Sequence, residues 1–538
     1  MQACTGTGSG QRRRRRPEQV SKATSGFTGI TSDGQFTPAL VEARLYLDAV
    51  LSALKKYAEE TPRAIAVKDA TAEWTYERLW RSARSAAADL RASGARRGRA
   101  VALHAAKSPE SIALVVACGL ADVPVLLPSV DLGPDAAAAL RERASCSHTI
   151  TWRHRSAPGG PLCFSVEPSG LPPRAPLPAD TPLVLTTSGS TGVPKPVALS
   201  GAGVERFLRW AATEFGIGRG TVVLSYAPLN FDLTLLDIWT TLHAGGTVRL
   251  VDKAEATDGR ALRALLAEDR VEVVQAVPLL FRLLDGDGAS FPAVRHVITT
   301  GDVLPPQQLP RLAELFPNAA AHNLYGCTET NDSAIHRIDP DRDATRRALP
   351  IGRPIAGAEL LVVDADDRPL AGAAVGELLV STPFQAHGYL DRSLTASRFT
   401  TIRDGGSAKV FYRSGDIVRR DADGLLHLEG RDDFHVKVRG VRTNMQEVEH
   451  VLGSHPDVQE VAVVAVPDDT AGHRLHAELR TTAGSRVNGL HLRVHCAASL
   501  PRTAIPSSFR MNDRDLPRTS TGKVDRTAIL ASLSTEGN

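Results

Sequence analysis

The sequence predicts an α/β protein with a large N-terminal domain of helix-covered β-sheets, a β-barrel-like subdomain, and a small mobile α+β C-terminal domain. Up to about Ile351, short apolar runs alternate with Ala/Leu/Arg-rich helical stretches, which is typical of parallel sheets covered by helices. After Ile351, short strands separated by Asp/Gly turns predict hairpins. We therefore expect a disordered basic tail at 1–36, the large domain at 37–432 and the small domain at 433–538.

The expected elements follow the chain in order. Residues Ala39 to Ala58 have the apolar spacing of a helix, "AIAVKD" is a short strand, and "WTYERL" (Trp74 to Leu79) turns into another helix. The remaining strand-like runs of the large domain are "RAVALHA", "VPVLLPS", "PLVLTT", "TVVLSYAP", "TVRLV" and "VEVVQAV", followed by the hairpin runs "AELLVVDADDRPL", "GELLVS" and "GLLHLEGRDD". In the small domain we expect a buried strand and turn at "VQEVAVVAVPDD", a helix at "LHLRVHCAASLP" and a polar loop at "LPRTSTGKVDR".

Composition places the chain among globular proteins. It has 538 residues, 42% hydrophobic and 23% charged, with a formal net charge of +3. The basic run "QRRRRR" (Gln11 to Arg16) could bind nucleic acid or anionic lipid, but a solvated tail is the simpler interpretation, so we expect neither partner. The six cysteines lack CxxC spacing, and neither a membrane span nor a signal peptide is evident, so we expect a cytoplasmic protein.

The stretch "LTTSGSTGVPKPVAL" (Leu185 to Leu199) predicts a loop that holds an anion. It leaves the carboxyl end of a predicted strand, where ligands of α/β sheets bind. Its backbone amides and hydroxyls would be donors, and Lys195 would supply a cation; the donors are Thr187, Ser188, Gly189, Ser190, Thr191 and Gly192. The spacing differs from the nucleotide-binding P-loop, and taken alone the run could be a flexible linker.

Four further motifs follow in order: "NLYGCTET" (Asn323 to Thr330), "YRSGD" (Tyr412 to Asp416), "GRDDFHVKVRGVR" (Gly430 to Arg442) and "TSTGKVDR" (Thr519 to Arg526). With the Ser/Gly-rich loop, this ordered set closely resembles the adenylate-forming superfamily. That superfamily comprises adenylation domains of nonribosomal peptide synthetases, acyl-CoA ligases and luciferases. The resemblance runs from about Leu45 to Ala531 and is greatest to a stand-alone amino-acid adenylation enzyme.

The resemblance implies a reaction that joins a carboxylate to the α-phosphate of ATP and releases pyrophosphate. The Ser/Gly-rich loop would cover the β- and γ-phosphates, Thr328 would contact the α-phosphate, and Glu329 would hold Mg²⁺. Tyr325 would stack near the adenine, and Asp416, with Arg431 beside it, would bind the ribose hydroxyls. Lys523 would bridge the substrate carboxylate and the α-phosphate, which would neutralise charge in the transition state.

The same resemblance implies a second half-reaction, in which the acyl group passes to a phosphopantetheine thiol. Asp433 occupies the family's hinge position, and Lys437 and Gly440 would belong to the face used in this second state. Two departures from the family pattern are Pro196, where glycine is usual, and Ser129–Val130, which interrupt the usual "PIDP". Neither removes a catalytic group.

The substrate pocket is inferred from the stretch "NFDLTLLDIW", in which Asp232 takes the place of the residue that binds a substrate ammonium in amino-acid adenylation domains. The alternative is an aspartate that caps the following helix. The other pocket positions are mostly apolar and favour a small or medium aliphatic acid, although Asp332 could bind a second cation or point at solvent; they are Leu233, Leu236, Ala276, Ile298, Thr300, Leu324, Asp332 and Ser333.

Two questions stay open at the level of sequence. The stretch "FDLTLLDIW" is similar both to D-alanine–carrier protein ligases and to enzymes that load β-amino acids, so the amino group could be α or β. Because no segment able to form a carrier domain follows Lys523 before Asn538, we expect the thiol to come from a separate carrier protein, or else from coenzyme A. The competing hypotheses are an acyl-CoA ligase acting on a non-amino acid, and a non-catalytic binding protein.

Overall fold

The computed structural model describes residues 46–130, 132–154, 160–172, 176–187, 194–286, 288–404, 407–431, 434–438, 441–468, 472–497, 500, 504–519 and 522–536. These residues all belong to one compact unit, Arg44–Asn538. The predicted tail, the loop residues Ser188 to Gly192 and the predicted hinge Asp433 lie outside the described residues. The domain boundary at Asp433 stays a prediction.

The largest sheet has nine strands in the order β15-β14-β13-β12-β11-β9-β10-β1-β2. Its inner strands are parallel, as the alternating pattern predicts, while β2, β14 and β15 are antiparallel. The expectation of parallel pairing was wrong at these edges: short turns join β1 to β2 and β13 to β14, and such turns permit only antiparallel pairing, while β15 pairs with β14 after a longer connection that contains a helix. The strands are β1 (Ile65–Lys68), β2 (Glu73–Thr75), β9 (Val222–Ser225), β10 (Thr247–Leu250), β11 (Val273–Ala276), β12 (His296–Thr300), β13 (Ala320–Cys327), β14 (Asn331–Arg337) and β15 (Arg353–Pro354).

A second sheet has seven strands in the order β18-β8-β7-β4-β3-β5-β6. Here too the centre is parallel, and β6, β8 and β18 pair antiparallel. Lys195, expected in the anion-binding loop, is the first residue of β8 and pairs with Thr187 at the end of β7. The strands are β3 (Val101–His104), β4 (Val125–Leu126), β5 (His148–His154), β6 (Cys163–Pro168), β7 (Leu183–Thr187), β8 (Lys195–Ala198) and β18 (Gly388–Tyr389).

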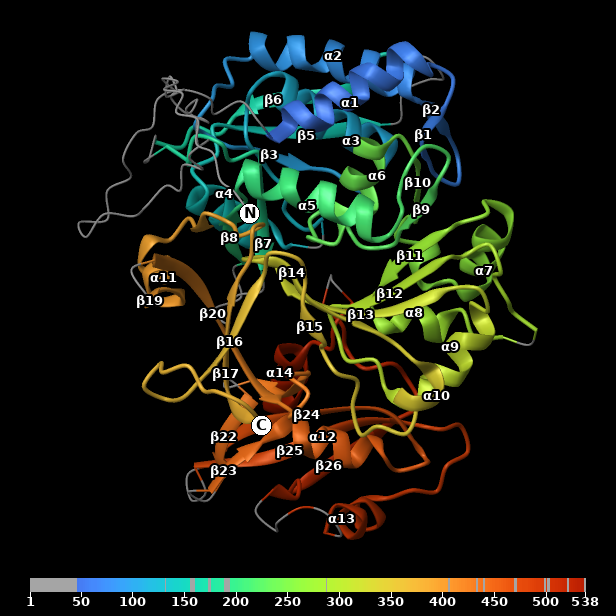
Figure 1. The fold of residues 1–538 in the computed structure, drawn as a ribbon, viewed down its shortest axis with the longest axis vertical. Coiled ribbons are helices and arrows are strands. Elements are labelled where there is room, and N and C mark those ends of the chain that lie inside the picture. The colour runs from blue at the N-terminus through green and yellow to red at the C-terminus, as the bar shows by residue number, and fades with distance from the viewer. Residues whose placement is uncertain are drawn as a thin grey trace, which may run out of the picture. The chain divides into compact units, whose positions relative to one another are not determined.

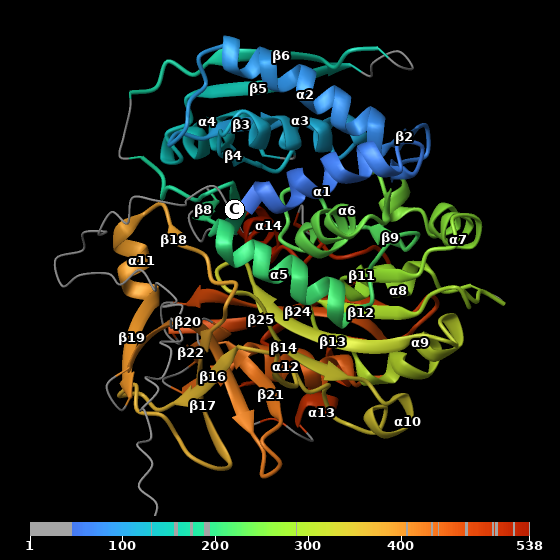
Figure 2. The ribbon, with the colours of Figure 1, turned by 45° about the horizontal axis from the view of Figure 1, so that its top comes forward.

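Helices cover both sheets (Figures 1 and 2). The first described helix runs two residues beyond its expected end at Ala58, and residues 39–45 lie outside the described ranges. In both views α5 and α6 lie between the seven-stranded and nine-stranded sheets. The helices of this region are α1 (Tyr46–Glu60), α2 (Tyr76–Ala92), α3 (Pro109–Leu120), α4 (Pro134–Arg143), α5 (Gly201–Glu214), α6 (Thr241–Ala244), α7 (Gly259–Glu268), α8 (Pro278–Leu283), α9 (Leu309–Leu315) and α10 (Pro340–Asp343), with the 3-10 turns η2 (Glu255–Thr257) and η3 (Pro306–Gln308).

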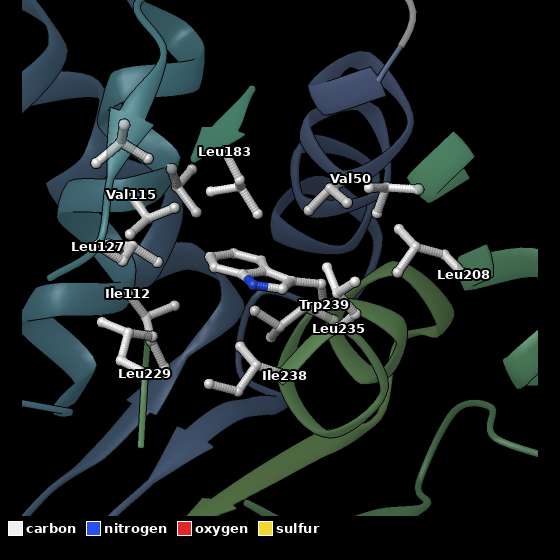
Figure 3. Packing of buried hydrophobic residues seen from close by; sticks show 14 of the residues in the cluster. Val50, Ile112, Val115, Leu127, Leu183, Leu208, Leu229, Leu235, Ile238 and Trp239 are labelled. Carbon is white, nitrogen blue, oxygen red and sulfur yellow. The ribbon is translucent and has the colours of Figure 1, made fainter. Parts of the chain in front are cut away.

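The main hydrophobic core joins the two sheets. Trp239, which is almost completely buried, packs among Leu235, Ile238 and residues of α1, α3 and β7 (Figure 3). Trp239 belongs to η1 (Leu235–Thr240), a π-helical turn that continues into α6. The helical turn that follows Asp232 is therefore anchored in the core by its apolar side chains.

The hairpins predicted after Ile351 form a five-stranded antiparallel sheet of order β16-β17-β20-β19, with β21 paired to β20. In this order the sheet does not close on itself within the described strands. The C-terminal segment forms a β22–β23 hairpin and the sheet β24-β25-β26 with helices, as expected for an α+β domain. These elements are β16 (Glu359–Val363), β17 (Ala374–Ser381), α11 (Arg392–Arg398), β19 (Phe399–Asp404), β20 (Ser407–Arg420), β21 (Leu426–Arg431), β22 (His435–Val438), β23 (Val441–Asn444), α12 (Met445–Gly453), β24 (Val458–Asp468), β25 (Gly472–Thr481), α13 (Gly489–Ala497), β26 (Ser508–Asn512) and α14 (Arg526–Glu536).

Candidate active site

A continuous cleft follows the carboxyl ends of β7, β11, β12 and β13 and reaches the C-terminal segment. This is the edge at which α/β sheets bind their ligands. The structure brings together here residues from motifs that lie far apart in the sequence. Predicted site residues that line the cleft are Thr187, Lys195, Asp232, Leu233, Thr300, Leu324, Tyr325, Thr328, Glu329, Asp332, Asp416, Arg431 and Lys523.

Four of the predicted pocket residues do not line the cleft. Leu236, Ala276, Ile298 and Ser333 are completely buried, and the first three belong to the hydrophobic core clusters. The Ser333 hydroxyl lies 3.1 Å from that of Thr330. Direct contact of these four residues with a substrate stays a prediction.

Asp232 lies in the segment between β9 and η1, and its side chain is held from another motif. Thr328 Oγ1 donates a hydrogen bond of 2.7 Å to the Asp232 carboxylate. Burial raises the pKa of Asp232, and the Thr328 hydroxyl and the positive charge of Lys523 oppose this rise. The N-cap of η1 is Thr234, so Asp232 does not cap that helix. The carboxylate is therefore available to the cleft.

Asp332 adds a second carboxyl group to this part of the cleft. It is partly buried in β14, and its pKa is well above the usual value because of burial and the negative charge of Asp232. Two nearby carboxyl groups that repel each other favour a bound cation or a shared proton.

Glu329 is buried at the floor of the cleft, next to two tyrosines. Its carboxylate accepts a hydrogen bond from the hydroxyl of Tyr389, and that hydroxyl lies 3.1 Å from the hydroxyl of Tyr412. Burial and the charge of Glu329 raise the pKa of both tyrosines, so both stay protonated at neutral pH. Tyr389 is a site residue that the sequence analysis missed. Its surroundings, "HGYL", belong to none of the motifs, so nothing in the sequence connects it with Glu329.

The donor set around Glu329 fits a cation that is bound mainly by its substrate. No group of three or more His, Cys, Asp or Glu side chains that could hold a metal occurs among the described residues. Mg²⁺ commonly binds proteins through one or two carboxylates and takes its remaining ligands from phosphate and water. A single buried carboxylate in a cleft is compatible with that mode.

Asp416, on β20, is the centre of a second polar cluster. One carboxylate oxygen accepts a hydrogen bond of 3.0 Å from Arg431 Nη1, and the other accepts one from the hydroxyl of Tyr325. Asp416 and Arg431 are directly opposite each other in the β20–β21 pair. The predicted pairing of Asp416 with Arg431 is thus present, and the Tyr325 hydroxyl is directed at Asp416.

Lys523 enters the cleft from a turn that precedes α14. The turn is closed by Thr519 N–H donating to the Lys523 carbonyl at 2.8 Å, and Gly522 adopts the left-handed conformation with φ of +81°. The side chain of Lys523 is exposed, and its charge lowers the pKa of Asp232. An exposed cation thus lies near the carboxylate that the sequence assigns to the substrate.

An ionic cluster joins the C-terminal segment to α8 near this turn. Glu460, on β24, pairs with Arg518 and lies 3.7 Å from Arg282 Nη2. Burial lowers the pKa of Arg282, and the charge of Glu460 opposes that effect.

The fold and the cleft together define the class of protein to which this chain belongs. At the edge of a parallel sheet, the cleft has hydroxyl and lysine donors and the buried carboxylate of Glu329. It also has the carboxylate of Asp416, which is flanked by an arginine and a tyrosine, and the exposed Lys523. Residues 54–390 match the family model described as "AMP-binding enzyme", and residues 447–523 match "AMP-binding enzyme C-terminal domain". The chain belongs to this adenylate-forming family.

Two of the curated relatives are named as ligases of proline to a carrier protein, and a third is named as a tripeptide synthetase. The chain is 31% identical to L-proline--[L-prolyl-carrier protein] ligase of Pseudomonas fluorescens, over 90% of this chain and 99% of the relative. It is 35% identical to the ligase of the same name from Streptomyces coelicolor, over 65% of each chain. It is 34% identical to phosphinothricin tripeptide synthetase PhsB of Streptomyces viridochromogenes, where the match covers 90% of this chain but 42% of the relative.

Solved structures agree with the fold. Klebsiella oxytoca NpsA, in complex with 3-hydroxyanthranilyl-AMSN, has a TM-score of 0.75 at 25% identity and covers 90% of this chain and 99% of that chain. The amide bond synthetase McbA from Marinactinospora thermotolerans has a TM-score of 0.70 at 26% identity, with the same coverage. None of the described helices is both long and apolar enough to cross a membrane.

Proposed function

We propose that the protein activates an amino acid as its aminoacyl adenylate and passes the acyl group to the phosphopantetheine thiol of a separate carrier protein. The observation that carries this proposal is the carboxylate of Asp232, which is partly buried, lines the cleft and has a raised pKa because of its burial. Burying such a group is costly unless a cation pairs with it, and a substrate ammonium would provide one. The relatives named as proline–carrier protein ligases support the same substrate class and acceptor.

In the first half-reaction the substrate carboxylate attacks the α-phosphorus of ATP. A new oxygen–phosphorus bond forms, the bond to the bridging oxygen breaks, and pyrophosphate leaves. Lys523 would lie between the two anions and reduce their repulsion as they approach. Asp232 would hold the ammonium at the other end of the substrate, which fixes the direction of the carboxylate.

The nucleotide would be oriented by the remaining groups of the cleft. Asp416, which accepts a hydrogen bond from Arg431, would also accept hydrogen bonds from the ribose hydroxyls, and Tyr325 would lie beside the base. Thr187 and Lys195 would extend the phosphate site at the start of the Ser/Gly-rich loop. Glu329 would hold Mg²⁺, which when bound would neutralise phosphate charge.

In the second half-reaction the thiol sulfur would attack the acyl carbon, a thioester would form, and AMP would leave with the electron pair of the broken bond. This step would follow a pivot at Asp433 that presents the segment with Lys437 and Gly440. A cytoplasmic location belongs to the same proposal, because the reaction consumes ATP.

The test is ATP–pyrophosphate exchange across α-amino, β-amino and desamino acids of matched carbon skeleton. We expect the wild type to prefer an amino acid, and Asp232→Ser to lose about 3 to 5 kcal/mol of this interaction. That loss corresponds to roughly 100-fold to several thousandfold in kcat/KM at about 1.4 kcal/mol per decade. The desamino acid should be slow with the wild type and little affected by the substitution.

Two outcomes would contradict the proposal. If the wild type prefers the desamino acid, or Asp232→Ser lowers both activities equally, the alternative of an acyl-CoA ligase replaces it. If the preferred amino acid is transferred to coenzyme A but not to any phosphopantetheinylated carrier protein, the acceptor is wrong and the substrate class stands.

A further inference from the structure

A polar network adjoins the Asp232 segment, with Gln275 also on the cleft wall, and is not explained by the reaction described above. It consists of Lys107, from the turn between β3 and α3, Asp237 of η1, and Gln275 of β11. Asp237 is 0% exposed and Gln275 is 1% exposed. Three polar side chains in this position require a physical reason, because burial of polar groups is unfavourable unless hydrogen bonds compensate.

Gln275 connects the network to the substrate-binding turn. Its side-chain amide Nε2 donates to the carbonyl oxygen of Leu233 at 3.0 Å and to Asp237 Oδ1 at 3.3 Å. Leu233 directly follows Asp232, and its carbonyl also accepts the backbone N–H groups of Leu236 at 3.1 Å and Asp237 at 3.2 Å. Gln275 therefore fixes the first turn after Asp232 to a central strand of the sheet.

Lys107 holds the other end of the same segment. Its Nζ donates to the carbonyl oxygens of Ser225 at 2.6 Å and Ala227 at 2.7 Å, where the chain leaves β9 on its way to Asp232. The segment 225–237 is thus tied at both ends by side chains from other elements, and Thr328 holds the Asp232 carboxylate between them.

The charges of this network do not favour a role in stability. Asp237 Oδ2 is buried and has no hydrogen-bond partner among the described residues. Burial lowers the pKa of Lys107 to about 7 and raises the pKa of Asp237 well above its usual value. Apolar side chains of similar size at such positions are often neutral or stabilising, so the network is better explained by the geometry that it imposes.

We propose that Gln275 is the positioning residue for amine recognition, and that Lys107 and Asp237 support it by fixing both ends of the segment that carries Asp232. The inference rests on the proposed function, since it assumes that Asp232 binds the substrate ammonium. Gln275 would act through the Leu233 carbonyl without touching the substrate ammonium.

The test compares Gln275→Leu with the wild type in ATP–pyrophosphate exchange, using the preferred amino acid and its desamino analogue. We expect KM for the amino acid to rise about tenfold, KM for ATP to stay unchanged, and the ratio of amino to desamino kcat/KM to fall about tenfold. A merely structural role would instead lower the amount of active enzyme, which reduces kcat for both acids equally.

Two further variants separate positioning from stability. Tyr76→Phe removes a buried hydrogen bond of 2.7 Å to the Gly246 carbonyl, away from the residues that line the cleft. It should lower the melting temperature without changing the ratio between the two acids. The double variant Asp237→Leu with Gln275→Leu removes both polar partners, so it should regain stability relative to Gln275→Leu while the loss of amine preference persists.

The outcomes distinguish this inference from the proposed function. If the wild type shows no preference for the amino acid, the proposed function fails. If the wild type shows that preference and Gln275→Leu retains it, or if the double variant restores it together with stability, the positioning role of Gln275 is overturned.

Discussion

The Thr328 hydroxyl and the Asp232 carboxylate are joined by a hydrogen bond of 2.7 Å. This contact connects the residue expected at the α-phosphate with the residue expected at the substrate ammonium. A hydroxyl has one proton to donate. If a substrate ammonium took the place of the Thr328 hydroxyl at Asp232 Oδ2, the Thr328 proton would be free to turn to a phosphate oxygen, and arrival of the amine would then prepare the phosphate site.

The first prediction concerns Thr328→Val, which keeps the shape of the side chain and removes its hydroxyl. The hydrogen bond stabilises the ionised form of Asp232 and opposes the rise in its pKa. Loss of the hydrogen bond should raise the pKa of Asp232 further. The acid limb of the pH profile of kcat/KM for the amino acid should therefore move to higher pH. Thr328→Ser should keep the wild-type limb. An unchanged limb in Thr328→Val would show that Asp232 does not control it.

The second prediction tests the role of Tyr389 beside Glu329. Tyr389→Phe removes the hydroxyl that donates to the carboxylate and leaves the ring in place. The carboxylate should then be less well oriented, and the Mg²⁺ concentration needed for half-maximal pyrophosphate exchange should rise several-fold. Asp391→Asn, which removes a carboxylate from the start of α11, is the control and should not change it. Loss of activity that saturating Mg²⁺ cannot restore would contradict this role.

The third prediction concerns the nucleotide side of the cleft. Asp416→Asn replaces a carboxylate that accepts from Arg431 and Tyr325 by an amide with one acceptor oxygen. KM for ATP should rise about tenfold or more, as expected for losing charge-assisted hydrogen bonds. The wild type should discriminate against 2′-deoxy-ATP or 3′-deoxy-ATP, and the variant should do so less. Full discrimination in the variant would place the ribose elsewhere.

The fourth prediction separates the two half-reactions. Lys523→Ala should slow adenylate formation by at least the roughly 100-fold typical of losing one positioned electrostatic donor. Thioester formation from a preformed aminoacyl adenylate should be affected much less. Lys253→Ala removes a lysine that does not line the cleft and should leave both rates unchanged. An equal loss in both half-reactions would argue against a role limited to the first.

Local motifs allowed much of the site to be predicted from sequence. Asp416 and Arg431 occur in motifs whose strands are neighbours in a hairpin, so their pairing follows from the register. The contact between Thr328 and Asp232 joins residues 96 positions apart and depends on how β13 lies beside β12 and β11, which no local pattern specifies. Gln275 was missed for a related reason, because a glutamine in an apolar strand has no motif spacing.

In the fold too, some features follow from local sequence patterns and others do not. Apolar runs predicted most of the inner parallel strands, because those strands are buried on both faces, but β5, β12 and β13 were not among the predicted runs. Antiparallel pairing at the edges of the sheets was harder to predict, because it depends on the connections between the strands and because the edge strands are short or partly exposed. The wide turn η1 could not be distinguished from an α-helix, because the run "LTLLDIW" is too short to separate the two periods.

The π-helical turn η1 also limits how the pocket can be redesigned. A π-turn contains one residue more than the α-helical turn that could replace it, and each residue of an α-helix accounts for about 100° of rotation. Deleting one residue between Leu235 and Thr240 would therefore turn Trp239 out of its place in the core or carry Asp237 away from Gln275. Substitutions at Leu233 leave the directions of the following side chains unchanged, whereas a transplanted segment that is one residue shorter would rotate them. Specificity in this protein can thus be changed by exchanging side chains, provided that the length of the segment is preserved.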